Sequence, residues 1–254
     1  MERILGDLIS ERNHKRVYVH DGIITKVFDH NFYHGYNVMR EASIQQFVME
    51  SGLPVPKVYD VFQVGDDWAF TSQEIKGRTL ESIIEADPEH KKQHVVKMLQ
   101  AHIRLLSKLC KNNFLPDLKA KVKRYIEEAS LDPSQRYDIQ LKLEKFPNHL
   151  NICHGDIYPH NIMVTDDGTF YILDWAHCSK GNATADIVNT YLMFLIDGEP
   201  KIADIYLREF SKKSYTSMSY IKGWVAVLSA AYLTRVNDEK KKEILLKNID
   251  TVTY

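Results

Sequence analysis

The chain has 254 residues, of which 44% are hydrophobic and 26% are charged, and a chain of this composition buries a core rather than staying disordered. Its 33 Lys and Arg residues nearly balance its 34 Asp and Glu residues, which argues against dedicated binding of nucleic acids or anionic membranes. It has three cysteines and no Cys-x-x-Cys motif, which argues against a disulfide framework or a structural zinc site.

The segment that opens the chain, MERILGDLISER, carries acidic residues where a secretory signal peptide would need an apolar run. The longest nearly apolar stretch, residues 224–233, is too short to span a membrane. We therefore expect a cytoplasmic protein, without a nucleic acid, a membrane or an obligate protein partner.

Strands, one helix and more strands are predicted for the first 77 residues. The predicted strands are residues 7–10, 16–20, 23–28, 58–64 and 68–72, joined by turns such as Asp21-Gly22. Residues 37–51 have apolar groups at helical spacing, with Asn37 as the predicted cap and Gly52 at the end.

Helices dominate the chain after Gly77. One predicted helix starts at Asp87-Pro88 and has an apolar face over residues 95–110. Further helix is predicted for residues 119–146, 221–233 and 239–249, with three or four helices after Ala185. A second hairpin is predicted for residues 161–173, around the turn Asp166-Asp167-Gly168. This change of character predicts a sheet-rich N-terminal lobe over residues 1–77 and a larger helical lobe over residues 78–254.

The most informative segment is HGDIYPHN, residues 154–161, which is followed by LDW ending at Trp175. The hairpin between Asn161 and Asp174 is expected to return these two residues to the same end, near Asp156. Carboxylate and amide oxygens of this kind suit Mg²⁺, which binds through one or two carboxylates together with substrate phosphates. A further carboxylate can orient a nucleophilic hydroxyl or accept its proton.

This pattern, His-Gly-Asp-x-x-x-x-Asn with a later Asp, resembles the aminoglycoside phosphotransferase and choline-kinase-like family. The resemblance implies an α+β fold of the bilobal protein-kinase type, with a small antiparallel-sheet N-lobe and a larger, mainly helical C-lobe. It also implies a small-molecule kinase that uses ATP or GTP with Mg²⁺ to phosphorylate a hydroxyl. Asp156 would be catalytic, and Asn161 and Asp174 would hold the metal.

The N-terminal lobe fits the same resemblance. Lys26, in the third predicted strand, matches the family's phosphate-contacting lysine, and Glu41, in the next helix, matches its ion-pair partner. Residues 70–77 resemble the connection between the lobes, which implies adenine contacts from the carbonyl of Gln73 and the N–H of Ile75. Taken alone, these are an ordinary strand lysine, a solvated glutamate and a plain strand end.

Two further features concern the loops around the nucleotide. No glycine-rich phosphate loop occurs in the sequence, and the loop over residues 10–15 has no glycine, so Ser10 is the candidate phosphate contact, with a turn residue as the alternative. The resemblance implies that Asp186 braces the catalytic loop by accepting its backbone N–H groups. A helix N-terminal acid is the alternative for Asp186. His154 is expected to support this loop structurally.

The acceptor is predicted from charge. Residues 154–200 carry a net charge of −6, and residues 201–254 carry +4. Acids not used for catalysis would attract an amino-bearing substrate, and Trp175 and Trp224 are the predicted pocket walls. Surface acids far from the pocket and core tryptophans are the alternatives.

Two other functions fit parts of the sequence. A pseudokinase-like module would bind nucleotide without transferring phosphate, and the glycine-free loop favours it. A protein kinase would need an Ala-Pro-Glu segment after Asp174, and the sequence has none.

Overall fold

The structure is a computed structural model that describes residues 4–250. The chain divides into two compact units. Unit 1 contains the chain up to Ala86 together with Pro159–His177, and unit 2 contains Asp87–Tyr158 together with the chain from Cys178 onward.

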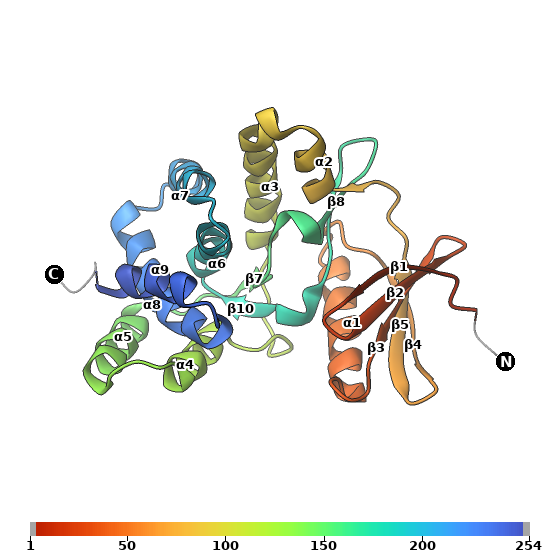
Figure 1. Cartoon of the computed structure of the whole chain (residues 1–254), viewed down its shortest axis with the longest axis horizontal. Helices are drawn as coiled ribbons and strands as arrows, with labels where there is room; N and C mark the ends of the chain where they lie inside the picture. The colour runs from red at the N-terminus through yellow and green to blue at the C-terminus, as the bar shows by residue number, and fades with distance from the viewer. Residues whose placement is uncertain (1–3, 251–254) are drawn as a thin grey trace. The chain divides into compact units, whose positions relative to one another are not determined.

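Unit 1 is built on an antiparallel sheet of five strands in the order β1-β2-β3-β5-β4, with helix α1 packed on β4 and β5 (Figure 1). The strands are β1 Asp7–Arg12, β2 Lys15–His20, β3 Ile23–Phe28, β4 Val58–Val64 and β5 Asp67–Gln73, and the helix is α1 Gly35–Glu50. Phe28, Val38, Ala42 and Phe70 form the buried core between this helix and the sheet.

The predicted strands of this sheet are confirmed with small shifts at their ends. The first hairpin is tighter than predicted, because β1 continues to Arg12 and the turn contains only Asn13 and His14. Both turn residues have left-handed backbone, with φ of 49° and 61°, which suits a two-residue hairpin. Helix α1 begins at Gly35 rather than at Asn37, and the Asn37 side chain accepts the backbone N–H of His34 at 3.0 Å.

A second, smaller sheet completes unit 1. It has the order β6-β8-β9 and includes β6 Arg78–Thr79, β8 Ile162–Val164 and β9 Phe170–Ile172. Helix α2, Leu80–Ala86, and the single turns η2 Pro159–Asn161 and η3 Trp175–His177 accompany it.

This sheet is the reason why the units differ from the predicted division at residue 77. Arg78 and Thr79 pair with Val164 and Met163, so the later hairpin belongs to the same unit as the N-terminal sheet. At Gly77 a Cβ atom would lie 2.3 Å from the carbonyl oxygen of Val164, so the close approach of these segments requires glycine.

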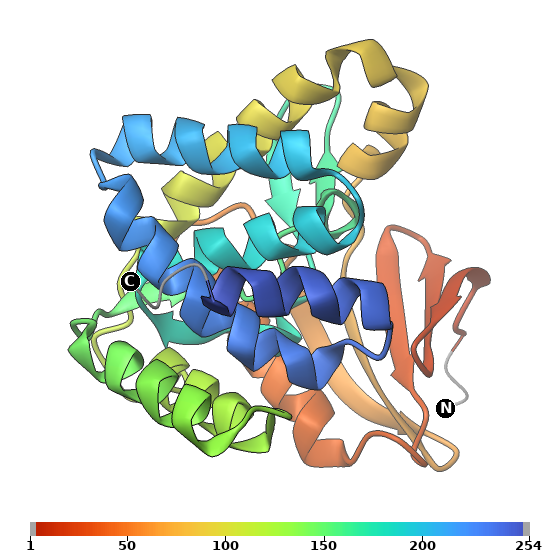
Figure 2. The same cartoon turned by 60° about the vertical axis from the view of Figure 1, so that its left-hand side comes forward.

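Unit 2 is mainly helical. Its helices are α3 Lys91–Leu106, α4 Leu118–Glu128, α5 Pro133–Lys145, α6 Ala183–Ile196, α7 Pro200–Ser214, α8 Met218–Tyr232 and α9 Glu239–Asp250. Its shorter elements are η1 Pro88–His90, β7 Asn151–Cys153, β10 Ser179–Gly181 and η4 Leu233–Arg235. Helix α8 packs against α9, as Figure 2 shows, and also against α6, and most of its side chains are buried.

The helical stretch predicted over residues 119–146 is two helices in the structure. Asp132 begins the second one by accepting the backbone N–H groups of Ser134 and Gln135 at 2.9 and 3.0 Å, and Pro133 occupies the first helical position. Within residues 4–250, no helix combines the length and the apolar character that a membrane crossing needs.

Candidate active site

Lys26 of β3 and Glu41 of α1 form a close ion pair in unit 1. The Lys26 Nζ lies 2.6 Å from Glu41 Oε1 and 3.7 Å from Asp174 Oδ2. Burial by itself would lower the pKa of Lys26, but the carboxylates of Asp174 and Glu41 raise it above its ordinary value. The ammonium therefore stays charged, and Glu41, which is 4% exposed, holds it in place.

A second lysine joins this cluster, and sequence reasoning missed it. Lys15, the first residue of β2, places its Nζ 3.4 Å from Glu41 Oε2 and 3.9 Å from Asp174 Oδ1. It reaches them because the hairpin turn at Asn13 and His14 is tight and sets Lys15 at the start of its strand. No spacing motif marks such a residue.

Asn161 and Asp174 lie at the same end of the β8–β9 hairpin, as the sequence predicted. The backbone N–H of Leu173 donates to the carbonyl oxygen of Asn161 at 2.8 Å. Asp174 has left-handed backbone with φ of 60°, which is uncommon outside glycine and marks a position held by its surroundings. The amide of Asn161 and the carboxylate of Asp174 supply the kind of oxygen donors that bind Mg²⁺ carried by a nucleotide. Lys15 and Lys26 lie near Asp174.

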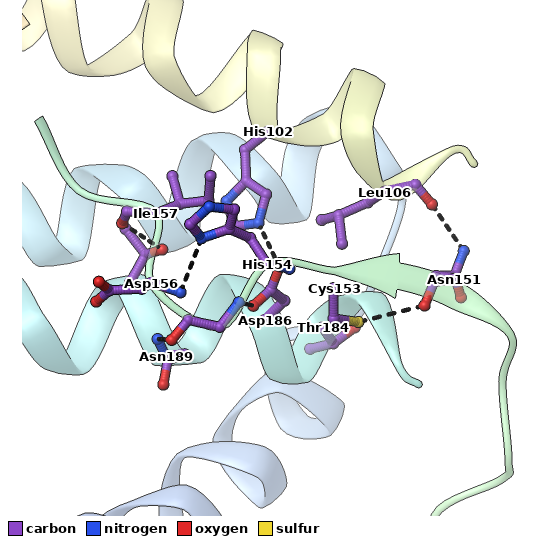
Figure 3. A network of polar contacts seen from close by, with 12 residues as sticks. His102, Leu106, Asn151, Cys153, His154, Asp156, Ile157, Thr184, Asp186 and Asn189 are labelled. Atoms are coloured by element: carbon purple, nitrogen blue, oxygen red, sulfur yellow. Dashed lines mark hydrogen bonds and ion pairs between the residues drawn. The ribbon is translucent and has the colours of Figure 1, made fainter. Parts of the chain in front are cut away.

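In unit 2, the buried carboxylate of Asp186 holds the loop that carries Asp156 (Figure 3). It accepts the backbone N–H groups of His154 and Gly155, each at 2.7 Å. His102 Nε2 lies 3.0 Å from the same carboxylate, and its Nδ1 lies 2.8 Å from the Tyr206 hydroxyl. Burial alone would raise the pKa of Asp186, but these hydrogen bonds and the nearby histidines lower it, so the carboxylate stays ionised.

The loop from His154 to Ile157 is anchored at further points. The backbone N–H of Asp156 donates to Nδ1 of the buried His154 at 3.1 Å. From α6, Asn189 donates to the Gly155 carbonyl at 3.0 Å, and Thr190 donates to the Ile157 carbonyl at 2.9 Å. The main chain at Asp156 is thereby fixed, which positions its carboxylate.

Residues 9–221 match the profile of the phosphotransferase enzyme family, APH. The chain belongs to this family. Among curated proteins, none has a significantly similar sequence.

Solved structures of small-molecule kinases share the fold of this phosphotransferase. A thermostable mutant of aminoglycoside phosphotransferase APH(4)-Ia matches with a TM-score of 0.67 and 13% identity, covering 97% of this chain and 93% of that one. An aminoglycoside-3'-phosphotransferase of type VIII matches with a TM-score of 0.64 and 15% identity, covering 91% and 93%. Choline kinase LicA from Streptococcus pneumoniae matches with a TM-score of 0.61 and 15% identity, covering 97% and 92%. These matches confirm the protein-kinase-like fold.

The residues predicted to contact adenine and phosphate occupy defined positions in this phosphotransferase. Gln73 ends β5, and Ile75 follows it with a buried side chain. The intervening Glu74 donates its backbone N–H to the Gly22 carbonyl at 2.9 Å. Ser10 lies inside β1 opposite Val17, not in a loop, because the hairpin turn comes later than predicted.

The two predicted pocket walls are core residues instead. Trp175 is fully buried in unit 1 and donates its indole N–H to the Ile172 carbonyl at 3.1 Å. Trp224 is 1% exposed in unit 2, where its ring stacks on Phe146 at a centroid distance of 4.2 Å. A position next to Asp174 or on an apolar helix did not determine where these side chains point.

Replacing Asp186 with Asn should destabilise the phosphotransferase by about 2–3 kcal/mol at pH 7, because an amide nitrogen would face a backbone N–H donor. The lowered pKa of Asp186 stabilises the folded state above the ordinary carboxyl pKa, and this contribution is lost as the pH falls below about 4. Urea unfolding at pH 7 and below about pH 4 measures the free energy of unfolding of the wild type and of the variant. The exposed Asp204 of α7 provides the control Asp204→Asn, and equal stability of the two variants would contradict the bracing role.

Proposed function

We propose that the protein transfers the γ-phosphoryl group of ATP or GTP to a hydroxyl of a small molecule in a Mg²⁺-dependent reaction. The observation that carries this proposal is the cluster in which Lys26 pairs with Glu41 at 2.6 Å and lies 3.7 Å from Asp174. Nucleotide complexes of relatives support it, since APH(4)-Ia has been solved with ADP or AMP-PNP and hygromycin B, and LicA with AMP.

The proposed roles follow from the chemistry of each side chain. Lys26, steadied by Glu41, contacts the α- and β-phosphates, and Lys15 adds a second positive charge beside it. Asn161 and Asp174 would hold Mg²⁺, which when bound neutralises phosphate charge. Gln73 and Ile75 would contact the adenine through their backbone, as the resemblance implies.

Asp156 would orient the acceptor hydroxyl. The hydroxyl oxygen bonds to the γ-phosphorus as the bond from phosphorus to the bridging oxygen breaks, and the hydroxyl proton passes to the Asp156 carboxylate. A nucleoside diphosphate and a phosphate ester result. The transition state is loose, so positioning and charge stabilisation account for most of the catalysis.

We also propose that the protein acts in the cytoplasm. Cys110, Cys153 and Cys178 are all buried free thiols. Burial raises the pKa of Cys153 and Cys178, so both remain protonated and unreactive. Buried thiols without a disulfide suit a reducing compartment.

A coupled assay of nucleoside diphosphate formation tests the proposed function, with ATP or GTP, Mg²⁺ and a panel of neutral, cationic and anionic alcohols. We expect diphosphate release that depends on one class of alcohol and stops with a chelator. A pseudokinase-like module would bind Mg²⁺-nucleotide in calorimetry but release no diphosphate with any alcohol.

Lys26→Ala should lower kcat/KM for the nucleotide by about 10²-fold, the scale of losing one preorganised charge at a reacting phosphate. Lys15→Ala should lower it less, because the Lys15 Nζ lies farther from both carboxylates. Steady-state kinetics at saturating acceptor measures both variants, with the exposed Lys57→Ala as the control. A loss for Lys15→Ala that equals or exceeds the loss for Lys26→Ala would contradict Lys26 as the principal phosphate contact.

A further inference from the structure

A hollow in unit 2 opens beside the loop that carries Asp156. It opens to solvent, and the part that a water-sized sphere can occupy is about 30 Å³, which is room for about two waters or one small polar group. Helices α4, α6 and α8, the turn η4 and Gly155 surround it. Its polar and charged lining residues are Lys121, Tyr125, Asp186, Asn189, Tyr232 and Arg235.

The Asp186 carboxylate and the Asn189 amide of this lining already form hydrogen bonds with the loop that carries Asp156. Both oxygens of Asp186 accept backbone N–H groups, from His154 and Gly155, and Asn189 donates to the Gly155 carbonyl. The remaining charged groups of the lining, Lys121 and Arg235, are both positive. These two positive side chains line the hollow together with the ionised, hydrogen-bonded carboxylate of Asp186.

Arg235 is the most distinctive of these groups. Its guanidinium lies 4.9 Å from the ring centre of Tyr125 and 5.2 Å from that of Tyr232, so two phenol rings position it. Within residues 4–250 no carboxylate lies within 4.0 Å of it, and its side chain remains open to solvent. A planar guanidinium held in this way binds carboxylate or phosphate with two parallel hydrogen bonds.

The charged groups around the hollow act on one another's ionisation. Burial lowers the pKa of Lys121 and the charge of Arg235 lowers it further, while Tyr125 and Asp186 act to raise it. Burial would raise the pKa of Tyr125, but Arg235 and Lys121 lower it by hydrogen bonding and charge. The charge of Asp156, which directly follows Gly155 of the lining, acts to raise the pKa of both Arg235 and Tyr232.

The amino-bearing substrate was predicted from the acidic residues within 154–200, and several of these do not line the hollow. Asp166 and Asp167 lie in the exposed turn of the β8–β9 hairpin, where Asp167 accepts the Thr169 N–H at 3.0 Å. Asp197 pairs with Lys241 at 3.1 Å, and Glu199 pairs with Lys91 at 2.6 Å. The net charge of residues 154–200 is therefore not the charge of the hollow.

We propose that the acceptor is a small alcohol bearing an anionic group, a carboxylate or a phosphate monoester, which Arg235 and Lys121 bind while the hydroxyl meets Asp156. This inference rests on the proposed function for the presence of an acceptor. It reverses the sign of the charge predicted from the sequence.

Calorimetric binding of matched alcohols in low-salt buffer, without nucleotide, tests the proposal. One series is glycerate, glycerol phosphate, glycerol and aminopropanediol, and a larger one is gluconate, glucose phosphate, glucose and glucosamine. In at least one series we expect an anionic member to bind roughly 10- to 100-fold more tightly than its neutral counterpart. Comparing the carboxylate with the phosphate compound in each series shows which anionic group the protein binds.

Arg235→Gln should remove most of this preference, and Arg235→Lys should retain part of it. The exposed Arg208→Gln on α7 leaves it unchanged as the control. The proposal is wrong if no anionic member binds more tightly than its neutral counterpart, or if Arg235→Gln leaves the preference intact. Phosphorylation of a neutral or cationic alcohol would overturn it while leaving the proposed function standing. Anion binding that depends on Arg235, without phosphorylation of any alcohol, would support the anion site and overturn the proposed function.

Discussion

Asp156→Asn lowers turnover by roughly 10²- to 10⁴-fold, the usual contribution of a positioned general base, and leaves nucleotide affinity nearly unchanged. The amide has the size of the carboxylate but cannot take the hydroxyl proton. The loop should keep its geometry, because its anchors are backbone groups held by Asp186, Asn189 and Thr190.

Two measurements on this variant separate chemistry from binding. Turnover is recorded at saturating nucleotide and acceptor, and the affinity for AMP-PNP with Mg²⁺ is recorded by calorimetry. Asp166→Asn, in an exposed turn, is the matched control. Near-normal turnover of the Asp156 variant would remove this residue from the mechanism.

Asp174→Asn weakens Mg²⁺-nucleotide binding itself by at least about 10- to 100-fold, the scale on which even outer-shell changes affect metal sites. Its carboxylate is proposed to contact the metal before reaction as well as during it. Asparagine is the sharper test than alanine, because Asp174 has φ of 60° and asparagine adopts this backbone without added strain.

The Mg²⁺ dependence of nucleotide affinity measures this effect. Wild type should bind AMP-PNP more tightly as Mg²⁺ rises, and Asp174→Asn should lose most of that dependence. Asp167→Asn, in the turn of the same hairpin, serves as the control. If Asp174→Asn binds Mg²⁺-nucleotide as tightly as wild type, then Asp174 does not hold the metal.

The residues that sequence predicted best are those whose position depends on local pattern. Lys26 lies in a strand and Glu41 in the next helix, and the packing of that helix on the sheet brings them together. Asn161 and Asp174 flank a short hairpin, so strand pairing alone returns them to the same end. Both arrangements follow from pairing and periodicity over a short length of chain.

Other features depend on packing between distant segments. Lys15 reaches Glu41 only because the first hairpin turns within two residues, and Arg235 meets Tyr125 only when η4 packs near α4. The net charge of residues 154–200 does not describe the hollow for a similar reason, since a sum along the sequence does not show which acids are paired. The division at residue 77 did not anticipate the pairing of β6 with β8 across more than eighty residues.

Phosphorus NMR of the reaction mixture tests whether the protein transfers a phosphoryl group to a hydroxyl and whether this transfer depends on Asp156. Wild type with ATP, Mg²⁺ and the best-binding alcohol should convert the γ-phosphate signal into that of a phosphate monoester of the alcohol. Asp156→Asn should leave the ATP signals unchanged over the same period. If wild type binds Mg²⁺-ATP but forms no phosphate monoester with any neutral, cationic or anionic alcohol, the proposed phosphoryl transfer is contradicted.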